Sequence, residues 1–291
     1  MDKILITGGS GRVGSDLTKF FSKDNKVYAT FRKNNSITKN LRNKNIFWIK
    51  HDIKNSLTKR IQPNIIIHCA GVHPSSKNNN YKDYISSNII GLSKIIDFAK
   101  KNKIKKIFHL SSIDVYGNIQ KSVLNESSAY IEPSIFGCTK LFMERMISFE
   151  KIDYLNIRLP GVVGYQVNDY RGPWLCKIVN KLLKNKKIEI FNGNKSFNNI
   201  LDTYEIYKFI NYLKKKTLKR ETVNLSACKP INLKKLIFNI KKELNSNSKI
   251  LIKKNKSKYF IISNKKLINL YNYKLSTTSE IIRRYIRSFK I

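Results

Sequence analysis

Three glycines spaced by three residues, Gly8, Gly11 and Gly14, stand between an apolar segment and an amphipathic one. The segment before them, KILIT at residues 3–7, has the composition of a buried strand, and residues 15–23 carry a helical apolar stripe. A strand that turns tightly through glycine into a helix presents main-chain N–H groups at the positive end of the helix dipole. This arrangement predicts that a dinucleotide pyrophosphate binds at the turn. The predicted phosphate loop comprises Gly8, Gly9, Ser10, Gly11, Arg12, Val13 and Gly14.

The rest of the first half repeats the alternation of strand and helix. Further strands are predicted at residues 26–31, 46–53, 64–71, 106–112 and 154–164, and further helices at 88–101 and 134–149. This order predicts an α/β fold, a Rossmann-type doubly wound parallel sheet that binds ligands beyond the carboxyl ends of its strands.

The pattern becomes less regular after residue 164 and indicates a smaller mixed α/β C-terminal lobe. A helix that ends in KLLKNKK, a hairpin at residues 188–195, and two or three helices with a strand within 229–291 are predicted there. We expect residues 1–162 plus 198–226 to form the NAD(P)-binding domain. Residues 163–197 plus 227–291 would form the substrate-binding lobe.

The end of the second predicted strand bears on the choice of dinucleotide. It reads TFRK, so Arg32 and Lys33 stand where an acid would hold the ribose hydroxyls of NAD. A guanidinium there suits a 2′-phosphate, and Arg12 in the glycine loop could reach the same group. The sequence therefore favours NADP(H) over NAD(H), with ordinary surface cations as the alternative.

The chain is strongly basic, with 57 Lys and Arg against 19 Asp and Glu and a formal net charge of +38. Its lysines are spread along the chain rather than gathered in one arm, so compositional bias explains the charge better than a nucleic-acid surface does. Attraction of an anionic substrate stays open. Four scattered cysteines indicate reduced thiols in a cytoplasmic protein without a zinc site. No apolar run approaches the length of a membrane span.

Several motifs together resemble a known family. TGGSGRVG at 7–14, HDI at 51–53, HCAG at 68–71, LSSIDVYG at 110–117 and Lys140 look like the extended short-chain dehydrogenase/reductases. These are the NAD-dependent epimerase/dehydratase type, which commonly act on nucleotide sugars. RLPGVVG at 158–164 and FNNILDTYEIYKFI at 197–210 resemble later family segments more loosely.

The resemblance implies a role for individual residues. Asp52 and Ile53 would contact the adenine, Ala70 and Gly71 would line the cofactor path, and Pro160 would border the nicotinamide. Ser112 would hydrogen-bond the reacting group of the substrate, and Lys140 would hold the nicotinamide ribose and lower the pKa of a catalytic tyrosine.

The position of that tyrosine, four residues before Lys140, is occupied by Phe136. A phenol can donate or accept a proton, whereas a phenyl ring can do neither. Three interpretations stay open: an active reductase, epimerase or dehydratase with another acid, a binding protein or partner subunit without turnover, and a lineage in which activity has decayed. The candidates for another acid are His73, Tyr81, Tyr84 and Tyr116.

The resemblance also implies a nucleotide-sugar substrate bound by the smaller lobe. Trp174 could stack on the base, Arg171 could pair with the diphosphate, and His73 would face the substrate from the loop after the fourth strand. A core position for Trp174 and a solvated loop position for His73 are the alternatives. Relatives often dimerise through the helices after strands four and five, so a homodimer is one possible state, while the oligomeric state, the sugar and the reaction direction stay open.

Overall fold

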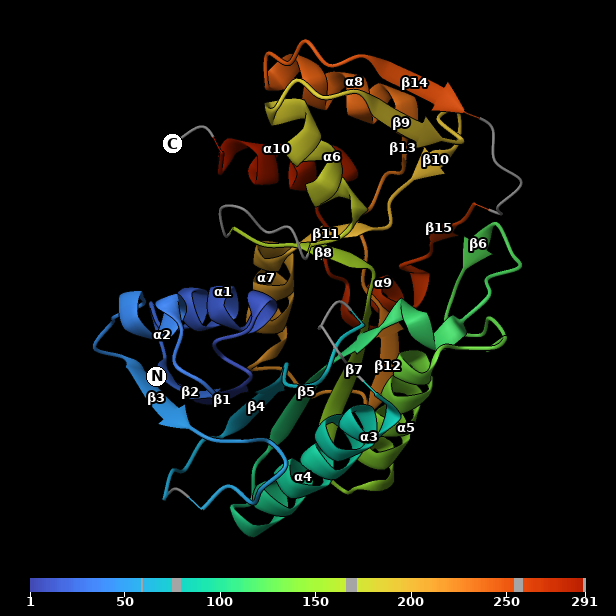
Figure 1. Cartoon of the computed structure of the whole chain (residues 1–291). Coiled ribbons are helices and arrows are strands. Elements are labelled where there is room, and N and C mark those ends of the chain that lie inside the picture. Colours follow the sequence, from blue (N-terminus) through green and yellow to red (C-terminus); the bar gives the residue numbers. More distant parts are fainter. Residues whose placement is uncertain (59, 75–79, 166–171, 254–258, 290–291) are drawn as a thin grey trace. The chain divides into compact units, whose positions relative to one another are not determined.

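A computed structural model describes residues 1–58, 60–74, 80–165, 172–253 and 259–289 (Figure 1). Contacts between Cα atoms divide the chain into two units. The first comprises Met1–Asn118, Tyr130–Arg158 and Ile206–Val223, and the second comprises Ile119–Ala129, Leu159–Glu205 and Asn224–Ile291. The predicted residue boundaries of the two domains stay a prediction.

The first unit is built on a seven-stranded sheet in the order β12-β7-β5-β4-β1-β2-β3 (Figure 1). Neighbouring strands from β3 to β5 pair in parallel. The seven strands are β1 (Lys3–Thr7), β2 (Lys26–Phe31), β3 (Ile46–Lys50), β4 (Ile65–His68), β5 (Lys106–Ser112), β7 (Asp153–Leu159) and β12 (Glu221–Asn224). The strand order reverses direction between β1 and β4, which is the switch point of a Rossmann-type fold. The predicted fold class is confirmed.

Helices cover both faces of this sheet, as the strand composition requires. Successive strand residues point to opposite faces, and the strands are apolar on both. Leu5, Ile66 and Ile107 lie in one buried cluster with side chains of α4 (Gly91–Lys101) and α5 (Ile135–Phe149). The other helices of this unit are α1 (Arg12–Phe21), α2 (Ser36–Asn40), α3 (Tyr81–Tyr84), the 3₁₀ helix η2 (Ile113–Tyr116) and α7 (Thr203–Leu213) from Ile206 onward.

The structure divides two of the predicted elements into two parts each. The helix predicted at 88–101 begins as a π-helix, η1 (Ile85–Ile90), before α4. The strand predicted at 154–164 is two strands, β7 and β8 (Gly161–Val163), separated by Pro160. Proline has no N–H to donate to a sheet, which accounts for the break.

Among its described residues, the second unit contains four small two-stranded sheets. They pair β8 with β11, β9 with β14, β10 with β13, and β6 with β15. The remaining strands are β6 (Val123–Leu124), β9 (Ile188–Phe191), β10 (Ser196–Phe197), β11 (Ile200–Asp202), β13 (Ile231–Asn232), β14 (Ile250–Lys253) and β15 (Ile261–Ile262). The helices are α6 (Trp174–Leu183), α8 (Leu233–Glu243), α9 (Lys265–Tyr271) and α10 (Thr278–Arg287).

The hairpin predicted at residues 188–195 is wrong. β9 pairs in parallel with β14, with Ile188 opposite Ile250, and β10 pairs with β13 instead. Asn192 has a positive φ of 54° and allows the chain to turn after β9, but the turn does not bring the two flanking strands together.

Within the second unit, a buried charge cluster ties α10 to the end of β11 and the first turn of α7. The guanidinium of Arg284 donates to Asp202 Oδ2 at 2.7 Å and to Glu205 Oε2 at 3.3 Å. The two carboxylate side chains are 1% and 0% exposed. Neutral donors such as the Tyr165 hydroxyl and the Ser276 N–H also reach these carboxylates, and Arg284 adds the positive charge that offsets the cost of burying them.

Candidate functional site

The glycine turn in the first unit has the geometry of a phosphate cradle. Gly8 has a positive φ of 67°, and a Cβ there would lie 2.9 Å from the Cα of Ala70. A Cβ on Gly14 would collide with the carbonyl of Gly8, so the first turn of α1 packs directly on the loop. The first turn of α1 carries no acidic residue, which leaves its positive dipole end available to an anion.

A cavity of about 460 Å³ opens beside this turn. Eight of the residues assigned to the cofactor from the sequence line it, namely Gly8, Ser10, Gly11, Arg32, Asp52, Ile53, Ala70 and Gly71. These residues follow β1, β2, β3 and β4, so the cavity lies at the carboxyl ends of four parallel strands. The lining also includes Thr30, His51 and Ser87, which the sequence analysis did not single out. His51 is the first residue of the HDI motif at 51–53, so the motif itself was the available signal.

Arg32 follows the last residue of β2 and lines the cavity together with Ser10. The Asn35 amide donates to the carbonyl of Ser10 at 3.3 Å and so ties the segment after β2 to the glycine loop. His51 also lines this cavity, and burial lowers its pKa while the neighbouring Asp52 acts to raise it. Arg32 therefore places a guanidinium in the cavity directly after β2, where an acid would hold the ribose hydroxyls of NAD.

Lys140 is buried on α5 in the same unit. Its Nζ donates to the carbonyl of Leu110 at 2.8 Å, and the residue is 7% exposed. Burial lowers its pKa to about 8, while Cys69 and Glu144 act to raise it. An ammonium has three protons to donate, so Lys140 can also hold a ribose hydroxyl.

Phe136 lies one turn before Lys140 and is 4% exposed. The Lys140 Nζ stands 6.0 Å from the centroid of its ring. The ring also meets the rings of His73 at 5.2 Å and Tyr84 at 6.3 Å. The place of a catalytic phenol is therefore filled by a buried hydrocarbon ring with an imidazole against it.

The Ser112 hydroxyl forms two hydrogen bonds with Asp114, two residues later in the chain. Its hydroxyl donates to Asp114 Oδ2 at 2.8 Å and accepts from the Asp114 N–H at 3.1 Å, which caps the helix η2. The preceding Ser111 donates to Glu144 Oε1 at 2.5 Å, and Glu144 forms a buried ion pair with Arg158. The predicted contact of Ser112 with a substrate would thus have to share the hydroxyl with Asp114.

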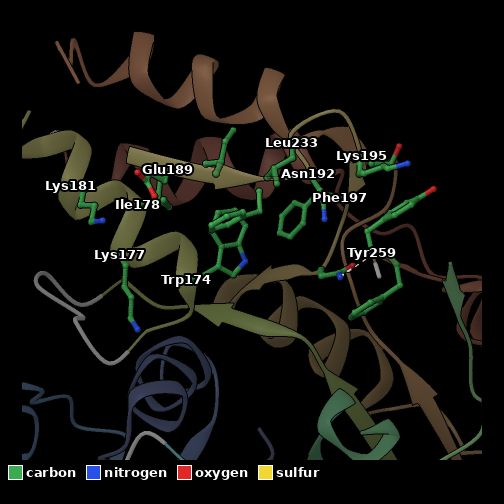
Figure 2. Close-up of a pocket in the computed structure, with 15 residues that line it drawn as sticks. Trp174, Lys177, Ile178, Lys181, Glu189, Asn192, Lys195, Phe197, Leu233 and Tyr259 are labelled. Atoms are coloured by element: carbon green, nitrogen blue, oxygen red, sulfur yellow. Dashed lines mark hydrogen bonds between the residues drawn. The ribbon is translucent and has the colours of Figure 1, made fainter. Parts of the chain in front are cut away.

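A second cavity, of about 710 Å³, lies within the second unit (Figure 2). Aromatic rings form much of its wall: Trp174 meets Phe197 edge to face at 5.3 Å, and Lys195 lies over the ring of Tyr259 at 4.5 Å. Lys177 and Lys181 extend from α6, and Trp174 is 38% exposed rather than part of a core (Figure 2). Arg171 lies outside the described residues.

The other residues that the sequence assigned to the cofactor or the substrate are divided between the two units. Gly9, Arg12 and Val13 belong to the glycine loop or the start of α1, and Pro160 is buried in the second unit between β7 and β8. His73 is exposed in the first unit, whereas Trp174 belongs to the second.

The parallel sheet, the glycine turn on α1 and the cavity at the strand ends define a dinucleotide-binding protein of the Rossmann type. The residues present fit such a cofactor, because the absence of side chains at Gly8 and Gly14 lets the turn pack tightly against Ala70 and the start of α1, beside the cavity. Residues 4–225 match the NAD-dependent epimerase/dehydratase family. The chain belongs to this family.

Individual relatives agree with this assignment. An uncharacterized protein of Methanocaldococcus jannaschii is 31% identical over 276 residues, covering 84% of this chain and 82% of that protein. The dTDP-D-glucose 4,6-dehydratase of Dictyostelium discoideum is 27% identical over 233 residues, covering 69% of this chain and 52% of the enzyme. The crystal structure of UDP-glucuronic acid 4-epimerase from Bacillus cereus in complex with NAD superposes with a TM-score of 0.81 at 20% identity. That superposition covers 99% of this chain and 100% of the other, and it shows the shared fold.

No helix among the described residues is long and apolar enough to cross a lipid bilayer.

Proposed function

We propose that the protein binds NADP(H) in preference to NAD(H), binds a nucleotide sugar, and carries out a redox step on the sugar as an epimerase, dehydratase or reductase. The observation that carries the dinucleotide part is the 460 Å³ cavity at the carboxyl ends of β1 to β4, with Arg32 in its wall. A guanidinium pairs bidentately with a phosphate, whereas a ribose diol prefers a carboxylate.

The aromatic and cationic cavity of the second unit supports the nucleotide-sugar part. Trp174 offers a face for a base, and Lys177, Lys181 and Lys195 offer charge for a diphosphate. Curated relatives bear the names of dTDP-glucose dehydratases and UDP-glucose epimerases, which directs the choice of substrates to uridine and thymidine diphosphate sugars.

A second candidate function is binding without turnover. Phe136 favours it, because proton transfer by a positioned side chain contributes about 10²- to 10⁴-fold to a rate. In that case both ligands bind and the redox step is absent.

The test of cofactor preference compares the wild type with Arg32→Asp. Calorimetric titration should show tighter binding of NADP⁺ than of NAD⁺ to the wild type. The Arg32→Asp variant should lose about 10- to 100-fold in NADP⁺ affinity, since hydrogen bonds to charged groups contribute about 1.5–3 kcal/mol.

Arg42→Asp is the matched control, because Arg42 is exposed, lies outside the cavity and undergoes the same change of charge. Equal binding of the two dinucleotides by the wild type would refute the preference. No uptake of either would refute the dinucleotide site itself. Turnover of UDP-glucose, dTDP-glucose or UDP-N-acetylglucosamine, followed by product analysis, separates the enzyme from the binding protein.

A further inference from the structure

His73 occupies the space beside the missing phenol. Its ring meets the Phe136 ring edge to face, with centroids 5.2 Å apart and an interplanar angle of 66°. The residue is nevertheless exposed, so a ligand can reach the imidazole from the solvent side. An imidazole at this position carries what the phenyl ring lacks, a group that both accepts and donates a proton near neutral pH.

A hydrogen-bonded chain holds the His73 loop against the helix that bears Phe136. Asn88, fully buried in the π-helix η1, accepts from the Val72 N–H at 2.8 Å. Its amide donates to Thr139 Oγ1 at 3.1 Å, and that hydroxyl donates to the carbonyl of Phe136 at 2.9 Å. A turn of π-helix displaces side chains relative to a regular α-helix and often occurs at functional sites. Here it brings Asn88 to the residue that precedes His73.

The charged groups around His73 come from three other elements. Arg12 on α1 and Lys140 on α5 act to lower its pKa, and Asp114 on η2 acts to raise it. The residue as a whole is exposed, but partial burial of its ring is the largest influence and lowers the pKa from the ordinary value of 6.5. This direction favours the neutral imidazole, which is able to accept a proton.

The tyrosines named as alternative acids are less suited than His73 to replace the phenol. The Tyr116 hydroxyl accepts from the guanidinium of Arg158 at 2.8 Å and is fully buried. Tyr81 is 56% exposed. Tyr84 is 6% exposed and its ring is 6.3 Å from that of Phe136, which makes it the nearest competitor of His73.

We propose that His73 is the general acid/base that replaces the phenol at position 136, an inference that rests on the proposed redox function. In the oxidation, a ring nitrogen of His73 takes the proton as the O–H bond of a sugar hydroxyl breaks. The hydride on the same carbon passes with its electron pair to the oxidised nicotinamide, and the carbonyl forms. In the reduction, the hydride returns from the reduced nicotinamide and His73 returns the proton to the oxygen.

The pH dependence has a defined sign in each direction. Oxidation needs neutral His73, so its rate falls as the pH decreases through the pKa of this residue. Reduction needs the protonated ring, so its rate falls as the pH rises through the same value.

The experiment compares four proteins: wild type, His73→Gln, Tyr84→Phe, and the double variant His73→Gln with Phe136→Tyr. Single-turnover rates are measured from pH 5 to 9 with NADP⁺ or NAD⁺ and the panel of nucleotide sugars named above, with ligand binding followed by calorimetry. Ring-proton NMR gives a readout that does not depend on activity. The chain has four histidines, of which His68 and His109 are fully buried, and the His73 signal is the one absent from His73→Gln.

We expect His73→Gln to lose about 10²- to 10⁴-fold in rate with binding unchanged, and to lose the acid limb of the oxidation profile. The double variant should recover activity through the restored phenol beside Lys140. Tyr84→Phe should stay within threefold of the wild type. The NMR pKa of His73 should lie below 6.5 and match the kinetic value.

Retention of the rate and pH profile in His73→Gln, or a large loss in Tyr84→Phe alone, would overturn the role of His73 and leave the proposed function standing. A wild type that binds both ligands without turnover at any pH would overturn the role of His73 and support the binding protein. Absence of dinucleotide binding in all four proteins would instead overturn the proposed function.

Discussion

The burial of Lys140 has a measurable consequence for stability. Its pKa falls from 10.5 to about 8 in the folded chain because the ammonium is removed from water. Each pH unit between the two values corresponds to about 1.4 kcal/mol, so the full difference is about 3 kcal/mol. Below pH 8 the lysine is protonated in both the folded and the unfolded chain. Between pH 8 and 10.5 the unfolded chain holds the proton that the folded chain has released, and the free energy of unfolding rises with pH.

Lys140→Met isolates this contribution, since methionine fills a similar volume and does not titrate. Urea unfolding of both proteins at several pH values from 7 to 10.5 gives the difference in free energy of unfolding at each pH. We expect the difference, wild type minus variant, to be constant up to about pH 8 and then to rise by up to about 3 kcal/mol. The other lysines and tyrosines titrate in both proteins and cancel. A difference that changes by less than about 1 kcal/mol over this range would refute the burial of the ammonium.

Two further predictions concern exposed aromatic residues. Trp174→Ala should weaken binding of uridine diphosphate by about 5- to 150-fold in calorimetric titration, since stacking of a base contributes about 1–3 kcal/mol. Trp48→Phe leaves Trp174 as the remaining tryptophan of the two, and its quenching by the nucleotide gives the dissociation constant, so an unquenched signal would contradict the stacking. Phe142, 55% exposed on α5, is our candidate contact for a homodimer, and Phe142→Glu should weaken dimerisation by at least about 30-fold in sedimentation equilibrium. Phe47→Glu, at a 42% exposed position on β3, is the control, and equal dimerisation of the two variants would place the interface elsewhere.

The sequence was sufficient for six of the seven strands of the sheet, because each of them is a short apolar run that local information determines. It did not predict β12, whose sequence ETVN has a single apolar residue. The break at Pro160 could also have been read, since proline interrupts a sheet on its own. The hairpin at 188–195 could not, because β9 pairs with β14 at Ile250 and nothing near β9 encodes that partner.

The candidate site was predictable in its residues and less so in their partners. The eight cavity-lining residues assigned from motifs lie together because motifs fix the carboxyl ends of the strands. The hydrogen bond of Ser112 to Asp114 depends on a side-chain rotamer, which spacing alone does not determine. The contact of His73 with Phe136 depends on the π-helix and Asn88, and a single extra residue in a helical turn leaves no signal in hydrophobic periodicity.

The charge cluster of the second unit sets an order for folding during synthesis. Asp202 leaves the ribosome 82 residues before Arg284, the guanidinium that neutralises it. Until α10 has been made, both carboxylates lack the Arg284 cation and are left with neutral donors such as the Tyr165 hydroxyl and the Ser276 N–H, while breaking a buried ion pair costs about 3–5 kcal/mol. We therefore expect a nascent chain arrested before Arg284 to pack less stably around β11 than the chain that includes α10.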